Sequence, residues 1–303
     1  MNAEEHTIKS GLVALAGPPN TGKSTLLNKL IGQKLAIVSP KPQTTRVRML
    51  GVVNGDGYQI VLVDTPGLHR GRSALNREMM RAAQSGLADV DLALFLVDAH
   101  EKPSAGKLEE LRGYVRAIAA PVLLLLNKCD LLAKDRVLPL IELWRDVRDF
   151  AAIIPISAMT GQGLDAVVAE VVARLPYGPR YFPDDIPTDA SERFLAAEII
   201  REKIFLRTGQ EVPYATAVLI ESFTMDQPGH ITIHAVIVAE RDSQKAIIIG
   251  KGGKKLKEIG ILARKEIEGM TGARIMLKLW VKVKKDWSED RNFLRELGFA
   301  PGP

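Results

Sequence analysis

The sequence predicts two domains: an α/β domain with a mainly parallel sheet, followed by a smaller α+β domain. Three observations support this fold class. The first half alternates short, almost continuous apolar runs with longer amphipathic stretches, as expected for strands buried on both faces and the helices that cover them. A proline-rich segment at 174–189 interrupts this pattern. After it, the order changes to helix, two strands, helix pair and strand.

The composition is that of an ordinary soluble globular protein. Of its 303 residues, 46% are hydrophobic and 25% are charged. The longest apolar run, Ala117 to Leu126, is far shorter than the roughly 20 residues of a membrane-spanning helix. The single cysteine, Cys129, allows no internal disulfide, and no secretory signal is visible at the N-terminus. We therefore expect a cytoplasmic protein.

Five apolar runs of strand length define the expected sheet of the first domain. They are rich in Val, Ile and Leu and show little polar alternation. The helix-like stretches between them include 105–118 and 136–149. In a parallel sheet of this kind, ligands bind beyond the carboxyl ends of the strands. The five runs are 11–17, 58–67, 91–100, 121–130 and 153–161.

The first run leads into the stretch GPPNTGKS, which fits the phosphate-binding pattern G-x-x-x-x-G-K-[ST]. Backbone N–H groups of such a loop surround a phosphate, and glycines let the chain approach it closely. Lys23 is expected to reach the outer phosphates, and the Ser24 hydroxyl is expected to bind Mg²⁺. The eight residues of the loop are Gly17, Pro18, Pro19, Asn20, Thr21, Gly22, Lys23 and Ser24.

The stretch NKCD, at the end of the fourth apolar run, favours guanine over adenine. The Watson–Crick edge of guanine presents two donors side by side, and the Asp130 carboxylate can accept both. Adenine would present an acceptor there and leave the carboxylate unpaired. We expect Asn127 to link this loop to the phosphate loop and Lys128 to lie along the base. In SAM, which follows the next run, Ser157 and Ala158 are expected to offer a backbone N–H to the guanine oxygen.

Two further stretches are expected to surround the γ-phosphate and to change with hydrolysis. In DTPG, Asp64 is expected to hold Mg²⁺ through water, and the Gly67 N–H to meet the γ-phosphate. In the stretch at 40–48, a threonine is expected to coordinate Mg²⁺; Thr45 is our choice and Thr44 the alternative. The two sets of residues are Asp64, Thr65, Pro66, Gly67 and Leu68, and Gln43, Thr44 and Thr45.

The prolines of the central segment set the expected domain boundary. We place the first domain at 1–175, a linker at 176–190 and the second domain at 191–303. Ser191 is the expected N-cap of the first helix of the second domain. The expected elements of that domain are a helix at 191–209, strands at 212–225 and 229–240, helices at 244–249 and 254–269, a strand at 273–285 and a short helix at 286–299.

The stretch GKGG lies between two expected helices in the most basic part of the chain. Residues 241–285 hold 13 Lys and Arg against four acids, whereas the whole chain has a net charge of +5. The KH module uses a G-x-x-G loop of this kind to bring a nucleic-acid backbone close, and lysines make such binding salt-dependent. The alternative is a helix–helix turn in which glycine supplies a positive φ. The candidate RNA-contacting residues are Gly250, Lys251, Gly252, Gly253, Lys254, Lys255 and Lys257.

Apolar and aromatic side chains near this loop have two interpretations each. Ile247, Ile248 and Ile249 are candidates for lining a groove that binds bases, although core packing is the commoner role for such a run. Trp280 and Trp287 are candidates for base stacking, but we favour packing in the core or under a lid.

Taken in chain order, GPPNTGKS, QTTR, DTPGLH, NKCD and IIIGKGGKKLKEIG resemble the Era family of bacterial GTPases, in the translation-factor-like (TRAFAC) class. The resemblance covers almost the whole chain. It implies a Ras-like P-loop NTPase domain, a type II KH domain and Mg²⁺-dependent hydrolysis of GTP to GDP and phosphate. It also implies binding to the 3′ end of 16S rRNA and a role in assembly of the 30S ribosomal subunit. We further expect a monomer. The resemblance also implies peripheral association with the cytoplasmic face of the inner membrane.

One residue departs from the pattern of Ras-like GTPases. Leu68 stands where a glutamine would position the attacking water, so the water must be oriented by other means. In related GTPases, an asparagine at the position of Asn20 binds K⁺, whose charge stabilises the transition state. The alternative for Asn20 is a turn residue. The catalytic candidates are therefore Lys23 and Asn20.

Two alternative functions stay open at this point. One is an RNA-binding assembly module whose GTP site is mainly structural, an idea that Leu68 supports. The other is a GTPase whose basic patch binds an anionic membrane surface, although the chain lacks an aromatic-rich amphipathic helix. An ATP-dependent kinase is disfavoured by NKCD.

Overall fold

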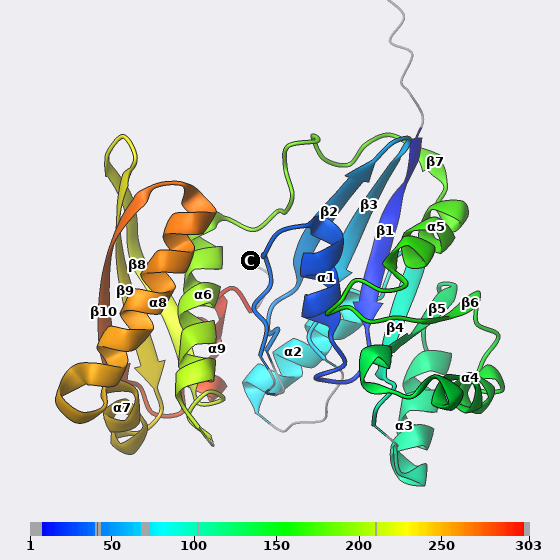
Figure 1. Cartoon of the computed structure of the whole chain (residues 1–303). Helices are drawn as coiled ribbons and strands as arrows, with labels where there is room; N and C mark the ends of the chain where they lie inside the picture. Colours follow the sequence, from blue (N-terminus) through cyan, green and yellow to red (C-terminus); the bar gives the residue numbers. More distant parts are fainter. Residues whose placement is uncertain are drawn as a thin grey trace, which may run out of the picture. The chain divides into compact units, whose positions relative to one another are not determined.

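The computed structural model describes residues 8–39, 41, 44–67, 73–101, 103–209 and 211–299 (Figure 1). The chain divides into two compact units. The first comprises Met1–Ala36, Thr45–Arg70 and Met80–Asp189; the second comprises Ile37–Thr44, Gly71–Met79 and Ala190–Pro303. Two short segments of the first half of the sequence thus belong to the second unit. In the described part of the chain, no helix has the length and apolar character needed to cross a membrane.

The first unit is built on a seven-stranded, mainly parallel sheet with the order β2-β3-β1-β4-β5-β6. Neighbouring strands from β3 to β6 are parallel, whereas β2 pairs antiparallel with β3, and β7 pairs antiparallel with β1. The predicted α/β class is therefore confirmed. The strands are β1 (Ile8–Ala16), β2 (Met49–Gly55), β3 (Tyr58–Asp64), β4 (Leu92–Asp98), β5 (Val122–Asn127), β6 (Ala152–Pro155) and β7 (Tyr177–Gly178).

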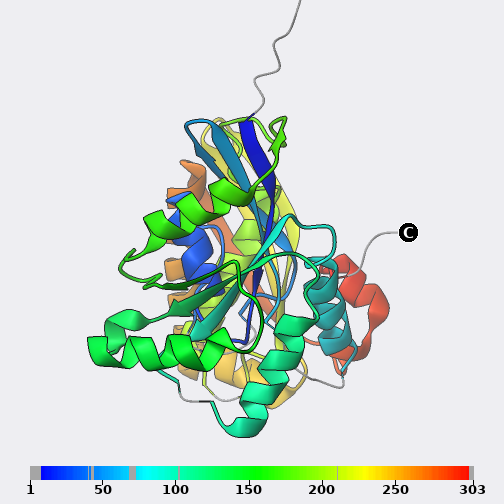
Figure 2. The same cartoon turned by 90° about the vertical axis from the view of Figure 1, so that its right-hand side faces the viewer.

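Helices lie on both sides of this sheet (Figure 1; Figure 2). Side chains of α2, α3 and α4 form one apolar core with inward-facing residues of the central strands, including Phe95 and Leu124. The other face is covered by α1, which contacts β2 and β3, and by α5, which contacts β6. The helices are α1 (Lys23–Ile31), α2 (Ala74–Ser85), α3 (Ala105–Arg116), α4 (Val137–Arg145) and α5 (Leu164–Arg174).

The proline-rich segment that was expected to be a linker is hydrogen-bonded to the first unit. The side-chain oxygen of Gln59, a buried residue of β3, accepts the backbone N–H groups of Tyr181 (2.7 Å) and Phe182 (3.0 Å). The Thr188 hydroxyl donates to the backbone oxygen of Leu50 at 2.6 Å. The segment is therefore bound along the edge of the sheet by hydrogen bonds.

The second unit contains a three-stranded sheet with the order β10-β9-β8, in which β9 is parallel to β10 and antiparallel to β8. The order of its elements confirms the predicted helix, two strands, helix pair and strand. Ser191 caps the first helix, as expected, because its hydroxyl accepts the N–H of Phe194 at 3.2 Å. The elements are α6 (Glu192–Arg207), β8 (Thr216–Gln227), β9 (His230–Ala239), α7 (Asp242–Ile249), α8 (Lys254–Thr271), β10 (Arg274–Val283) and α9 (Arg291–Glu296).

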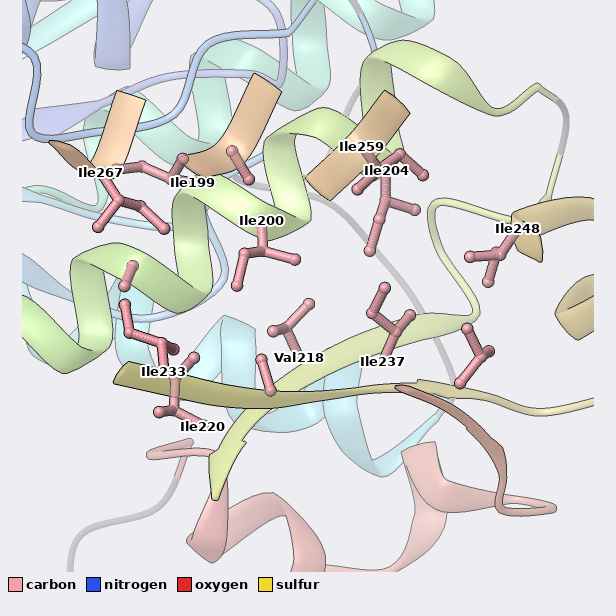
Figure 3. Close-up of a cluster of buried hydrophobic side chains, with 14 of the residues drawn as sticks. Ile199, Ile200, Ile204, Val218, Ile220, Ile233, Ile237, Ile248, Ile259 and Ile267 are labelled. Atoms are coloured by element: carbon pink, nitrogen blue, oxygen red, sulfur yellow. The ribbon is translucent and has the colours of Figure 1, made fainter. Parts of the chain in front are cut away.

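Alternating apolar residues place the core of this unit between the sheet and helices α6 and α8. Figure 3 shows Ile233 and Ile237 of β9 pointing toward Ile200 and Ile204 of α6, with Ile259 of α8 beside them. Each of these side chains is almost fully buried. Burying one such side chain stabilises the folded state by about 1.5–3 kcal/mol. The predicted alternation along β9 and β10 is thus confirmed, and it fixes which face of the sheet carries the helices.

The C-terminal residues cover part of the opposite face of the same sheet. Trp287 is fully buried there with Phe293 and Leu294, against Val236 and Val238 of β9. The indole N–H of Trp287 donates to a backbone oxygen at 3.1 Å. Trp287 is therefore a core residue, as we favoured.

Candidate functional site

The loop between β1 and α1 has a backbone that only glycine tolerates at two points. Gly17 has a φ of +135° and Gly22 a φ of +97°. A Cβ on Gly17 would lie 2.3 Å from the backbone oxygen of Leu96, and one on Gly22 would lie 2.3 Å from Nδ2 of Asn127. Because side chains are excluded, the backbone N–H groups of the loop and of the α1 N-terminus are left to face a phosphate.

Lys23, the first residue of α1, lies across this loop. Its side chain is buried, and Nζ donates to the backbone oxygens of Gly17 (3.0 Å) and Pro18 (2.8 Å). Burial lowers the pKa of Lys23 to about 8, although attraction to Asp64 opposes the shift. A desolvated ammonium held at this place is suited to a phosphate ligand, whose charge would offset the burial.

Three of the expected Mg²⁺ ligands come together beside the loop. Ser24 Oγ lies 2.9 Å from Thr45 Oγ1, which donates to Asp64 Oδ2 at 3.1 Å. Asp64 is fully buried, and its second oxygen, Oδ1, has no hydrogen-bond partner among the described residues. Burial raises the pKa of Asp64 to about 6, while Lys23 and hydrogen bonds act against the shift. Two hydroxyls and a carboxylate with an unsatisfied oxygen are a donor set that fits Mg²⁺.

The alternative threonine does not join this cluster. The Thr44 hydroxyl donates to the backbone oxygen of Lys41 at 2.9 Å, and its own backbone oxygen accepts from the side chain of Arg201. The geometry therefore favours Thr45 over Thr44. Two other candidates, Gln43 and Leu68, lie outside the described residues.

The DTPG stretch, at the end of β3, lies against the phosphate loop. The Thr65 side chain is buried, and its hydroxyl donates to the backbone oxygen of Leu15 at 2.8 Å. A Cβ added to Gly67 would come within 3.1 Å of Pro19 Cα and 3.3 Å of Lys23 Nζ. Gly67 is thus held next to the lysine ammonium, where its backbone can reach the same phosphate.

Asn127 joins three loops through one side chain. Its Nδ2 donates to the backbone oxygen of Thr21 at 2.7 Å, and its Oδ1 accepts the N–H of Ala158 at 2.9 Å. The expected link to the phosphate loop is confirmed. The N–H of Ser157 donates to the backbone oxygen of Gln162 at 3.0 Å, so both N–H groups expected to face guanine have protein acceptors here.

The two charged residues of NKCD differ in their surroundings. Lys128 has a left-handed backbone, with a φ of 68°, and its Nζ lies 2.5 Å from Oδ2 of Asp98 at the end of β4. The other oxygen of Asp98 accepts the N–H of His100 at 2.9 Å, which fixes the carboxylate. Asp130 is exposed in a short turn. Asp98 was not among the predicted site residues, although this residue lies at the end of an apolar run, as Asp64 and Asn127 do.

The glycine loop between α7 and α8 has open space around it. Gly250, Gly252 and Gly253 have φ values of +71°, +59° and +74°. A Cβ on Gly250 would lie 2.8 Å from Cβ of Lys255, whereas one on Gly252 or Gly253 would meet nothing within 4 Å. The loop therefore serves as a helix–helix turn and also leaves room for a nucleic-acid backbone.

A cleft of about 380 Å³ opens beside this loop, between α8 and β10. Of the isoleucine run, Ile248 is fully buried in the core, the commoner role for such a run, and Ile247 and Ile249 are not among the residues that line the cleft. Ile249 packs partly buried against the same core, whereas Ile247 is 43% exposed. The wall consists mainly of Leu256, Gly260, Ile261, Arg264, Leu277 and Leu279. The sequence feature that points to this cleft is Gly260, a glycine inside helix α8 whose missing side chain leaves space at the wall.

Comparison with known proteins gives two family matches and close relatives of nearly equal length. Residues 12–128 match the family described as 50S ribosome-binding GTPase, and residues 211–288 match the KH domain. The chain is 51% identical to GTPase Era of Geobacter metallireducens over 297 residues, 98% of this chain and 99% of that protein. It is 50% identical to GTPase Era of Geotalea daltonii over 295 residues, with 97% and 99% covered.

Two solved structures are similar over 97% of this chain and 100% of theirs, with a TM-score of 0.92 and 41% identity. One is a variant of Aquifex aeolicus Era bound to GDP and AlF4⁻. The other is Era in complex with MgGDPNP and nucleotides 1506–1542 of 16S ribosomal RNA. Both halves of the sequence therefore have counterparts in the same order in single known chains.

Proposed function

Given that this chain belongs to the Era family of GTPases, we propose that it binds the 3′ end of 16S rRNA and acts in assembly of the 30S ribosomal subunit while it hydrolyses GTP. The observation that carries the RNA part is the glycine loop at 250–253, which opens beside a cleft in the basic unit of a GTPase chain. An Era structure holds nucleotides 1506–1542 of 16S rRNA. We place this activity in the cytoplasm and assign it to a monomer.

The first unit would hold GTP by its phosphates and by its base. Lys23 would meet the outer phosphates, and the Gly67 N–H the γ-phosphate. Ser24, Thr45 and Asp64 would hold Mg²⁺, which neutralises phosphate charge when it is bound. The remaining proposed GTP contacts are those of Gly17, Pro18, Pro19, Asn20, Thr21, Gly22, Thr65, Pro66, Leu68, Asn127, Lys128, Asp130, Ser157 and Ala158.

The second unit would hold single-stranded RNA. Its sugar-phosphate backbone would pass Gly252 and Gly253, where no side chain is in the way, and bases would enter the apolar cleft between α8 and β10. The neighbouring lysines attract the phosphates. These lysines are Lys251, Lys254, Lys255 and Lys257.

A further part of the proposal is that K⁺ binds at Asn20. The residue is exposed and has a φ of 62°, so its side chain projects from the phosphate loop. Measuring GTP hydrolysis in KCl and in NaCl at equal ionic strength tests this, with Asn20→Ala as the matched variant. A faster reaction in KCl that Asn20→Ala abolishes is expected. Equal rates in both salts would contradict it.

The base assignment is tested by exchanging the hydrogen bonds at position 130. Asp130→Asn replaces an acceptor pair with one acceptor and one donor. We expect it to weaken GTP binding at least tenfold and to improve binding of xanthosine triphosphate, whose second carbonyl accepts from the new amide. Nucleotide titrations of both proteins, with ATP as control, measure this. Unchanged GTP affinity would remove the role of Asp130.

The RNA assignment is tested by footprinting the full-length protein, loaded with a GTP analogue, on an RNA that ends with the 3′ sequence of 16S rRNA. We expect cross-links from residues 250–257 to the RNA. Gly252→Asp places a carboxylate in the open space of the loop and should remove them while GTP hydrolysis continues. Cross-links that avoid 250–257 would overturn the RNA assignment.

A further inference from the structure

The face of the second unit's sheet that lies away from α6 and α8 is only partly covered. Trp287 and its neighbours occupy the part formed by Val236 and Val238. Farther along the edge strand β10, Met276 is 59% exposed and Trp280 is 43% exposed. Trp280, which we expected to pack in the core or under a lid, therefore presents much of its indole to solvent.

The indole of Trp280 is supported by its neighbours rather than loose. It lies on β10 opposite Val236 of the neighbouring strand, and its ring centroid is 5.4 Å from that of His234, with the planes at 57°. One side of the ring is therefore held by the sheet while the exposed part is available to a planar ligand. A large aromatic ring that is both held in place and exposed is the usual platform for base stacking.

The charges around Trp280 favour a polyanion. Lys278 and Lys282 flank it on the same face of β10, and Arg274 lies farther along. Lys282 pairs with Glu221 at 2.9 Å, but among the described residues Arg274 and Lys278 have no ion-pair partner. The other nearby carboxylate, Asp226, accepts hydroxyl hydrogen bonds from two threonines. Lys278 is thus a cation without an ion-pair partner among the described residues beside the exposed ring, and Arg274 is a second one roughly 20 Å along the strand, where a neighbouring phosphate of an extended RNA could lie.

We propose that this sheet face binds a segment of single-stranded RNA, with one base stacked on Trp280 and its phosphates near Lys278 and Arg274. The site is separate from the cleft, because Leu277 and Leu279 line the cleft from the opposite face of the same strand. Edge strand β10 would thus serve two RNA segments, one on each face. The inference goes beyond the proposed function, which uses only the glycine loop and its cleft.

A protein partner fits this face less well. The exposed apolar groups are Met276 and Trp280, and the residues around them are polar: cations, threonines, His234 and two carboxylates that are already paired or hydrogen-bonded. Stable protein interfaces have an apolar centre depleted of charge. The mixture of one supported indole, lysines and threonines is instead that of RNA-binding sheets.

The distribution of tryptophans makes the site directly observable. The chain has three, and Trp144 and Trp287 are 3% and 0% exposed, so quenching of intrinsic fluorescence reports mainly on Trp280. The full-length protein is titrated with an oligouridylate of about ten nucleotides at low salt. We expect saturable quenching that weakens as salt is added. In parallel, anisotropy of the labelled oligonucleotide measures its affinity.

Variants separate this site from the cleft. Trp280→Ala is expected to weaken binding of the oligonucleotide about tenfold. Trp280→Phe, which keeps an aromatic ring, is expected to weaken it much less. Lys278→Glu is expected to weaken it, whereas Lys134→Glu, an exposed lysine of the first unit, is the charge-matched control. Gly252→Asp impairs the loop beside the cleft and is expected to leave the quenching of Trp280 in place.

Several outcomes would overturn the inference, and one of them also bears on the proposed function. One such outcome is that anisotropy shows binding of the oligonucleotide while the tryptophan fluorescence is not quenched. Another is that Gly252→Asp abolishes the quenching. Either result assigns the RNA to the cleft alone and leaves the proposed function intact. Saturable binding of a protein rather than RNA to this face would likewise overturn the inference. If the oligonucleotide and the 16S rRNA sequence both fail to bind, the RNA part of the proposed function fails as well.

Discussion

Lys23 shows how one buried side chain lowers stability in favour of ligand binding. Its folded pKa of about 8 lies below the ordinary value of 10.5, so the folded chain binds this proton less tightly than the unfolded chain. The free energy of unfolding is therefore reduced below about pH 8 and recovers as pH rises from about 8 toward 10.5.

Lys23→Met is accordingly expected to raise the free energy of unfolding of the nucleotide-free protein at neutral pH by about 1–3 kcal/mol. The value is below the full shift because Gly17 and Pro18 lose a donor. The advantage should shrink as pH rises above about 8, and GTP binding should be lost. Denaturant unfolding at two pH values measures this, with the exposed Lys29→Met as control. A variant less stable than the wild type at neutral pH would contradict the argument.

Asp98 is expected to act on nucleotide binding through Lys128. Asp98→Asn removes the charge partner of the lysine, 2.5 Å away, so the lysine stem, which we propose lies along the base, loses its fixed position. We expect GTP and GDP to bind about three- to tenfold more weakly, to the same extent, because both carry guanine. The hydrolysis rate of bound GTP should not change. Glu101→Gln, an exposed residue nearby, is the control, and an effect on GTP alone would exclude this role.

Elements with a clear pattern were predictable, and those defined by tertiary contacts were not. The alternation of β9 and the cap at Ser191 are local features, and both are confirmed. Strand β2 was missed because it is an antiparallel edge strand without a long apolar run. The wall of the cleft beside the glycine loop was not predictable because it comes from α8 and β10, which meet only in the folded unit.

Helix α6 and its C-cap form hydrogen bonds with Val38, Lys41 and Thr44, contacts that no local sequence pattern reveals. Buried Glu202 accepts the N–H of Val38 at 3.0 Å, and Arg201 donates to the backbone oxygen of Thr44. Lys41 donates back to the C-terminal carbonyls of the helix. Since Thr44 directly precedes Thr45 in the chain, these bonds restrain the residue that joins the Mg²⁺ cluster.

Removing one of these bonds should therefore affect hydrolysis more than binding. Arg201→Ala is expected to slow GTP hydrolysis about tenfold and to leave GDP affinity unchanged, because GDP lacks the γ-phosphate that we propose Thr45 helps to enclose. The control is Arg207→Ala, at the exposed end of the same helix. Single-turnover hydrolysis and GDP titration measure the two effects, and thermal unfolding shows whether both variants fold. Equal losses in both assays would point to general damage.

The distribution of charge along the whole chain sets how RNA binding depends on salt. Thirteen basic and four acidic residues lie between 241 and 285, whereas the complete chain carries only +5, so the remainder is mildly acidic. A polyanion is thus attracted to one part of the molecule and weakly repelled by the rest. No acidic residue lies among the four lysines of the glycine loop and the start of α8.

For single strands, the logarithm of the binding constant falls with the logarithm of salt by about 0.7 for each phosphate neutralised. Contact with all four loop lysines predicts a slope of about −3. Replacing Lys251 and Lys254 together by alanine should flatten the slope by about 1.4, while basal GTP hydrolysis stays the same because neither lysine belongs to the nucleotide site. The matched control replaces Lys107 and Lys134 of the first unit, which should leave the slope unchanged. If both pairs flatten the slope equally, the attraction comes from the net charge of the chain, and the loop has no special part in it.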